Sequence, residues 1–213
     1  MKYLIYPIII CFIVFGNVNK AIADTIKNEL KHYKKIDLPY SSNETTEYYY
    51  WKGDDYVLYI SPNPKIPIRF SAKEYAYTPK LVRFSYKNSF YYPAIYFNYK
   101  NILYKGIIYM VYGTYGDDAI FFFQLNSYDK QGNFIDAITL DERLNAEGEA
   151  LWWSDFKIQA DGRITVNKME QMLIDDNGDN LKAGDIHVLA KIEYQMGSSG
   201  TFKKIKETVI RQR

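Results

Sequence analysis

Apolar and polar residues alternate along most of the chain, in short runs separated by Gly, Asn and Asp. Alternation with a period of two is typical of half-buried β-strands. Short turn sequences such as "DKQG" join several of these runs in pairs, which predicts β-hairpins. The paired runs span residues 46–51 and 56–61, 119–128 and 133–140, 154–159 and 163–166, and 186–196 and 201–210.

One segment near the N-terminus has helical spacing instead. Ile26, Leu30 and Tyr33 recur at i, i+4 and i+7, which predicts a short helix over residues 24–35. Pro39 ends it, because the residue before a proline favours an extended conformation. The whole pattern predicts a mainly β protein, an antiparallel hairpin meander closed as a barrel or sandwich, with one short N-terminal helix.

The first 23 residues have the three parts of a secretory signal peptide. Lys2 gives a positive start, an apolar run from Leu4 to Phe15 follows, and Ala21 and Ala23 form an A-x-A cleavage site. The run is shorter than the roughly 20 apolar residues that a transmembrane helix needs. We therefore expect cleavage after Ala23, export to the periplasm or the extracellular space without a membrane anchor, and a single β-rich domain over residues 24–213.

Charge and cysteine content narrow the classes of function. The chain holds 27 basic and 25 acidic residues, and removal of the predicted signal peptide removes two lysines and no acid. The formally neutral chain that remains lacks the basic face that nucleic acid requires. Cys11 lies inside the predicted signal peptide and is the one cysteine, so we expect the exported domain to hold no disulfide and to depend on its hydrophobic core.

A turn-rich stretch places oxygen-bearing side chains at alternate positions. Asp175, Asn177 and Asp179 match positions 1, 3 and 5 of a calcium-binding loop. Position 12, where that loop needs a bidentate glutamate, is Ile186. Asp-Asn-Gly is also a strong turn signal, because Asn and Gly tolerate positive φ angles. We interpret the stretch as a connecting turn, keep a calcium site as the alternative, and expect no cofactor.

Residues that could carry catalysis are sparse. His32 and His187 are the only histidines, and neither lies in a recognisable triad motif. Two adjacent aspartate pairs follow glycines at expected turns, and neighbouring residues on a strand point to opposite faces. The pattern favours binding over catalysis, with an enzyme built from one member of each pair as the alternative. These pairs are Asp54–Asp55 and Asp117–Asp118.

Tyrosine is the strongest compositional anomaly, with 22 in the chain and nine between Tyr86 and Tyr115. Tyr suits a half-buried strand, so core packing accounts for part of this density. Strand alternation should send some rings to the face away from the core, where Tyr and Trp give large contact area at small entropic cost. We predict a recognition surface that includes Tyr96, Tyr109, Tyr112 and Trp152.

An acidic stretch precedes the tryptophans, in "LDERLNAEGEALWW". Asp141, Glu142, Glu147 and Glu149 contribute four carboxylates between two expected strands. We expect a solvated loop here.

Together these features predict an exported bacterial-type binding protein. The leading hypothesis is a module that binds another protein, as an inhibitor or an immunity-like protein does. A glycan-binding or glycan-cleaving envelope protein that uses the Tyr and Trp surfaces is the first alternative. A structural envelope component is the second.

Overall fold

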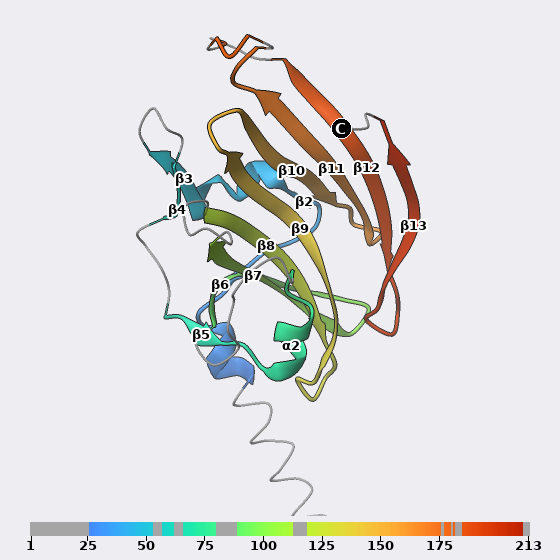
Figure 1. The fold of residues 1–213 in the computed structure, drawn as a ribbon. Helices are drawn as coiled ribbons and strands as arrows, with labels where there is room; N and C mark the ends of the chain where they lie inside the picture. Colours follow the sequence, from blue (N-terminus) through green and yellow to red (C-terminus); the bar gives the residue numbers. More distant parts are fainter. Residues whose placement is uncertain are drawn as a thin grey trace, which may run out of the picture.

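One large curled sheet dominates the structure, a computed structural model (Figure 1). Eleven strands belong to this sheet, and two more form a separate hairpin. The protein is thus mainly β with few helical residues, as the sequence predicts. The structure describes residues 26–52, 57–61, 66–79, 89–112, 119–175, 177–179, 181 and 185–210.

Eight strands follow one another as a meander, each antiparallel to the next. The predicted hairpins are confirmed, and their turns place Gly132, Gly162 and Gly200 at positive φ. Only glycine takes that conformation without steric cost. The strands are β6 (Phe90–Tyr99), β7 (Ile102–Tyr112), β8 (Ala119–Tyr128), β9 (Phe134–Ala146), β10 (Ala150–Ile158), β11 (Arg163–Met172), β12 (Ile186–Met196) and β13 (Phe202–Val209).

Shorter elements surround the meander. β1 runs parallel to β6, β5 also pairs with β6, and β2 pairs with β10, so the sheet is mixed. The helix predicted over residues 24–35 is too long at its C-terminal end: the described helix covers residues 26–30, residues 31–33 form a turn, and residues 34–35 form β1. The remaining elements are β1 (Lys34–Lys35), β2 (Tyr40–Ser41), η1 (Ser42–Glu44), η2 (Thr46–Tyr48), β3 (Tyr49–Lys52), β4 (Val57–Ile60), β5 (Ile68–Arg69) and α2 (Ala72–Ala76).

The sheet curls without closing, so the predicted barrel is wrong and the sandwich is not confirmed. β1 and β13 lie at opposite ends of the strand order and do not pair. β9 changes partner along its length: Phe134 to Arg143 pair with β8, and Leu144 to Ala146 pair with β10. From this strand the two halves of the sheet curve toward each other (Figure 1). Stacking of Phe123 in β8 on Phe156 in β10, at 5.6 Å between ring centroids, joins the halves.

β7 and β8 are buried on both faces. On the inside of the curl, Tyr104, Phe121 and Phe123 belong to the main core. On the opposite face, Tyr109 and Phe122 belong to a second core, which the chain before β1 and the segment from β5 to α2 cover. The consecutive residues Phe121, Phe122 and Phe123 of β8 therefore pack alternately into the main core and the second core.

Several predictions from sequence lie outside the described residues. The signal peptide and its cleavage site fall within residues 1–25, and the aspartate pairs fall within residues 53–56 and 113–118. Among the residues that are described, none forms a helix with the length and apolar character needed to cross a membrane.

Close approach of β6 and β8 to β7 depends on Gly106. A Cβ at this position would lie 2.6 Å from Ile95 Cγ1 and 2.9 Å from Phe123 Cζ. We predict that Gly106→Ala lowers the free energy of unfolding by about 1–3 kcal/mol through overpacking, as measured by urea denaturation. In a double-mutant cycle with Ile95→Ala the two losses should be less than additive. Strict additivity would show that the glycine is not required for this packing.

Candidate functional site

The described surface includes a hollow with a mixed polar and apolar lining and a hollow with a largely apolar lining. The first, of about 630 Å³, lies among the chain before β1, α2 and the meander; we call it the polar cleft. The second, of about 490 Å³, lies across β8 to β13; we call it the tryptophan groove. The polar cleft is defined by Glu29, Glu74, Lys105, Tyr128, Asn133 and Phe134. The tryptophan groove is defined by Leu144, Trp152, Trp153, Met169, Leu189 and Val209.

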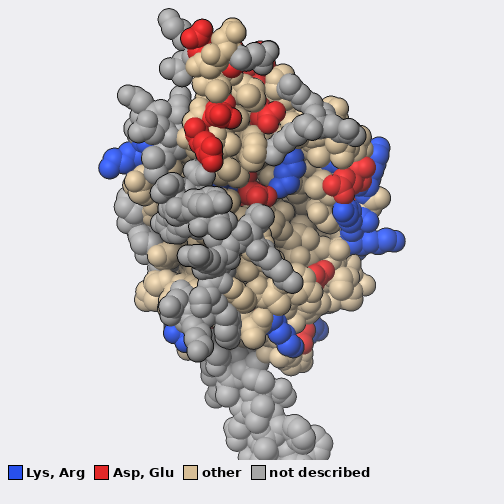
Figure 2. All heavy atoms as spheres, viewed as in Figure 1, with Lys and Arg blue, Asp and Glu red and all other residues tan. Residues whose placement is uncertain are grey.

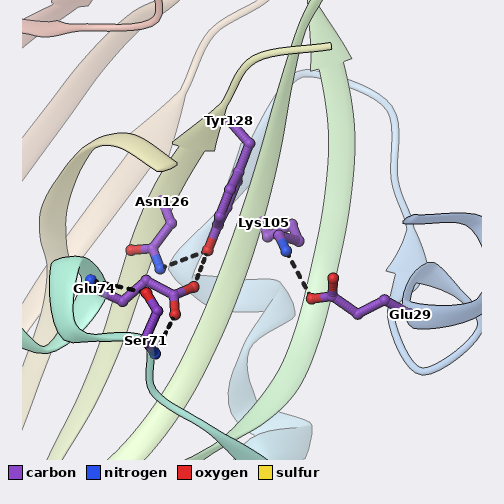
Figure 3. A network of polar contacts seen from close by, with 6 residues as sticks. All are labelled: Glu29, Ser71, Glu74, Lys105, Asn126 and Tyr128. Atoms are coloured by element: carbon purple, nitrogen blue, oxygen red, sulfur yellow. Dashed lines mark hydrogen bonds and ion pairs between the residues drawn. The ribbon is translucent and has the colours of Figure 1, made fainter. Parts of the chain in front are cut away.

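A chain of side-chain hydrogen bonds runs through the second core to the polar cleft. The Tyr109 hydroxyl donates to Gln124 Oε1 at 2.8 Å, and Gln124 Nε2 donates to Asn126 Oδ1 at 2.7 Å. Asn126 Nδ2 donates to the Tyr128 hydroxyl at 3.1 Å, which donates to Glu74 Oε1 (Figure 3). All four bonds point the same way, so each one polarises the next. The Glu74 carboxylate is the final acceptor.

α2 holds Glu74 in place although the helix has only five residues. Ser71 precedes it as N-cap: its hydroxyl accepts the Glu74 backbone N–H at 3.2 Å, and Glu74 Oε2 accepts the Ser71 N–H at 2.8 Å. This capping box satisfies backbone groups that the short helix leaves open. The Ser-x-x-Glu spacing at 71–74 is the sequence signal that could have predicted this buried carboxylate, which the sequence analysis missed.

A second ionic group occupies the floor of the cleft. Lys105, in β7, is 5% exposed, and its Nζ lies 2.6 Å from Glu29 Oε1. The same ammonium lies 3.8 Å from the centroid of the Tyr128 ring, a cation–π contact. Figure 3 shows Glu29 reaching the sheet from the N-terminal segment, so this pair ties that segment to β7. The charge of Lys105 is thus compensated within the fold.

Burial also fixes the protonation of the tyrosines near this cleft. It raises the pKa of Tyr33, Tyr91 and Tyr128, because a buried phenolate loses its hydration. The Glu74 charge raises the pKa of Tyr91 and Tyr128 further. These hydroxyls therefore stay protonated, which agrees with Tyr128 acting as a donor.

The tryptophan groove has few polar groups in its lining. Glu142 and Lys168 form an ion pair in its wall at 3.2 Å. The indole N–H of Trp152 donates to Glu170 Oε1 at 3.1 Å, which orients this ring. Trp153 is half-buried, so part of its ring faces water. An apolar hollow with a few placed polar groups is typical of a binding site.

A buried ion pair lies close to the groove, where β9 leaves β8. Asp141 is fully buried, accepts Arg143 Nε at 2.5 Å and accepts the Ser154 N–H at 2.9 Å. The Arg143 guanidinium stacks on the Tyr49 ring at 4.4 Å. Burial raises the pKa of Asp141 to about 6, although Arg143 and Ser154 oppose the shift. The expectation of a solvated acidic loop is therefore wrong for Asp141 and Glu142, which lie within β9, and it is confirmed for Glu147 and Glu149, which lie in the exposed turn that follows.

The predicted recognition residues do not form one surface. Tyr109 is 1% exposed and belongs to the second core, so its predicted exposure is wrong. Tyr96 is half-buried against the same core, and the side chain of Tyr112 lies outside the described residues. Trp152 lines the tryptophan groove. A role in binding stays a prediction for all four residues.

The stretch with the calcium-like spacing forms a turn in the structure. Asp175 Oδ1 accepts the backbone N–H groups of Asn177 and Asp179, at 2.8 and 2.9 Å. These bonds lower the pKa of Asp175. Gly178 takes a φ of 84° within the turn. Within the described ranges, no three His, Cys, Asp or Glu side chains come together as a metal site.

No protein-family model, curated protein or solved structure matches this chain.

Titration of Asp141 gives a testable pH dependence. Its folded-state pKa of about 6 exceeds the usual unfolded value of about 4. The folded state therefore binds the proton more tightly, so stability from this group is present below about pH 4 and is lost as pH rises through about 6. We predict that lowering the pH from about 7 to about 5 adds about 1 kcal/mol to the free energy of unfolding.

The free energy of unfolding is measured by urea denaturation at both pH values. The control is Asp141→Asn, which removes the titrating group, so its free energy of unfolding should lack this gain of about 1 kcal/mol at the lower pH. Identical pH dependence in the parent protein and in Asp141→Asn would contradict the assignment.

Proposed function

We propose that the chain is a protein-binding module that holds an extended segment of its partner against β13, with apolar side chains in the tryptophan groove. The observation that carries this proposal is that the groove adjoins the free edge of the sheet. Val209 lines the groove and belongs to β13. Within the described part of the chain, no strand pairs with β13 on its far side, and Figure 1 places it at the edge.

The backbone of β13 has groups available for such a partner. The Ile210 N–H donates to the Leu189 carbonyl of the neighbouring chain segment at 2.8 Å. In an antiparallel pair, alternate residues direct both backbone groups toward the neighbouring strand. Thr208 therefore faces β12, whereas Glu207 and Val209 direct their N–H and C=O groups away from the sheet. An added strand can bind these groups by β-augmentation.

Charge on β13 favours an acidic partner segment. Lys203, Lys204 and Lys206 belong to this strand. On the side of the molecule where Figure 1 places β13, Figure 2 shows Lys and Arg side chains with Asp and Glu side chains among them. Glu207 of β13 pairs with Lys204 at 2.7 Å, so the three lysines exceed the acidic charge of the strand by two. Lysines on an edge strand discourage pairing between two copies of the same edge. A segment that carries acidic residues would instead gain favourable electrostatic contacts.

The groove supplies the apolar part of the interface. Trp and Met are enriched at the buried centres of protein interfaces, and Trp152, Trp153 and Met169 line this groove together. A small apolar molecule could occupy the groove, but it would leave the backbone groups of β13 unused. A peptide segment uses both features, which favours a protein partner such as the target of an inhibitor.

The first test is selection of peptides from a displayed random library on the intact protein. We predict enrichment of extended sequences in which apolar residues alternate with Asp or Glu. Trp153→Ala should weaken binding of a selected peptide by about 2 kcal/mol, roughly thirtyfold, as for a central interface tryptophan. Tyr50→Ala is the matched control, because Tyr50 is an exposed ring on β3, outside the groove.

The edge is tested at Glu207 with a pair of variants. Glu207→Pro removes an N–H that faces away from β12 and should abolish peptide binding without breaking the sheet. Glu207→Ala keeps that N–H and should bind like the parent protein. Full binding by Glu207→Pro and Trp153→Ala, measured by calorimetry, would overturn the proposal.

A further inference from the structure

We propose that the polar cleft is a second binding site, whose ligand is a neutral, hydroxyl-rich molecule of the carbohydrate class. The cleft lies on the face of β7 and β8 that carries the second core, and it shares no defining residue with the tryptophan groove. The inference is therefore independent of the proposed protein-binding function.

The arrangement of Glu74 supports hydroxyl recognition. An ionised carboxylate offers about four acceptor positions, and within the described structure Tyr128 and the Ser71 N–H are its hydrogen-bond donors. The chain of hydrogen bonds from Tyr109 and the capping box hold the carboxylate before any ligand arrives. A preformed acceptor lowers the entropic cost of binding. A ligand hydroxyl can donate to its remaining positions.

Charge compensation in the cleft favours a neutral ligand over an ion. The Lys105 ammonium already pairs with Glu29 and contacts the Tyr128 ring. Arg69 and Lys73 add two positive groups to a lining that holds the carboxylates of Glu29 and Glu74, so the lining carries both signs in similar number. The lining therefore offers no single dominant charge that would select a strong anion or an organic cation. Sugar hydroxyls can donate to carboxylates and accept from ammonium groups at the same time.

An aromatic ring and the size of the cleft fit the same ligand class. Phe134 is half-buried in the lining, and its ring packs edge-to-face on Tyr128 and Tyr77, at 5.8 and 5.1 Å between centroids. These contacts fix its orientation. The C–H face of a sugar ring is apolar and can pack on such a ring, since that contact removes apolar surface from water. A volume of about 630 Å³ is typical of small-molecule sites.

The test is an NMR titration of the full chain with a panel of neutral mono- and disaccharides, with choline and inorganic phosphate as charged probes. We expect at least one saccharide to shift the resonances of Lys105 and Phe134, and the charged probes to leave them unchanged. Glu74→Gln should weaken saccharide binding by about tenfold or more, as for a lost hydrogen bond to a charged group.

Two further variants separate binding from folding. Glu74→Gln also weakens the cap of α2. Phe134→Leu leaves that cap intact, keeps an apolar side chain and removes the flat ring, and it should reduce affinity to a similar degree. Trp153→Ala lies in the other hollow and should bind saccharide like the parent protein. The inference is overturned if no saccharide shifts these resonances, if choline or phosphate does so instead, or if Glu74→Gln and Phe134→Leu both bind at full affinity.

Discussion

Burial of β7 and β8 on both faces is the constraint on which the rest of the structure depends. The inside of the curl requires the two halves of the sheet to pack together, as Phe123 and Phe156 do. The opposite face requires a cover, which the N-terminal segment and the chain from β5 to α2 supply. Each cover makes a polar contact with a buried residue of the sheet, because Lys105 binds Glu29 and Tyr128 binds Glu74. Hydrophobic packing and polar contacts thus hold the same two covering segments, the N-terminal segment and the chain from β5 to α2, against the sheet.

Both hollows adjoin the second core: Ile120 lines the tryptophan groove and packs on that core, and Phe70 and Tyr91 of the core line the polar cleft. The polar cleft forms where the outer cover meets β7 and β8, so its polar groups come from segments far apart in sequence. The tryptophan groove forms where β9 leaves β8 and pairs with β10, and the buried Asp141–Arg143 pair lies at that change of partner. Breaking a buried pair by removing one partner is strongly destabilising. The geometry of the groove therefore depends on an interaction outside its lining.

Local features of the fold could be predicted from the sequence, and long-range ones could not. Hairpins were predictable because glycines such as Gly132 and Gly162 mark turns between alternating runs. Curvature depends on irregular register, as between Phe123 and Gln124, which leaves no sequence signature. Tyr109 was placed on an exposed face because alternation shows which residues share a face and cannot show that a second core covers it. Glu74 was missed because a five-residue helix has almost no periodicity, although its capping spacing was visible.

The most direct test of the account is amide hydrogen exchange of β13 with and without a selected peptide. If the free edge binds a partner segment, the amides of Glu207 and Val209 exchange rapidly in the free protein and become protected in the complex. The Thr208 amide faces β12 and should be protected in both states. Unchanged rapid exchange at Glu207 and Val209 under saturating peptide would contradict binding at this edge.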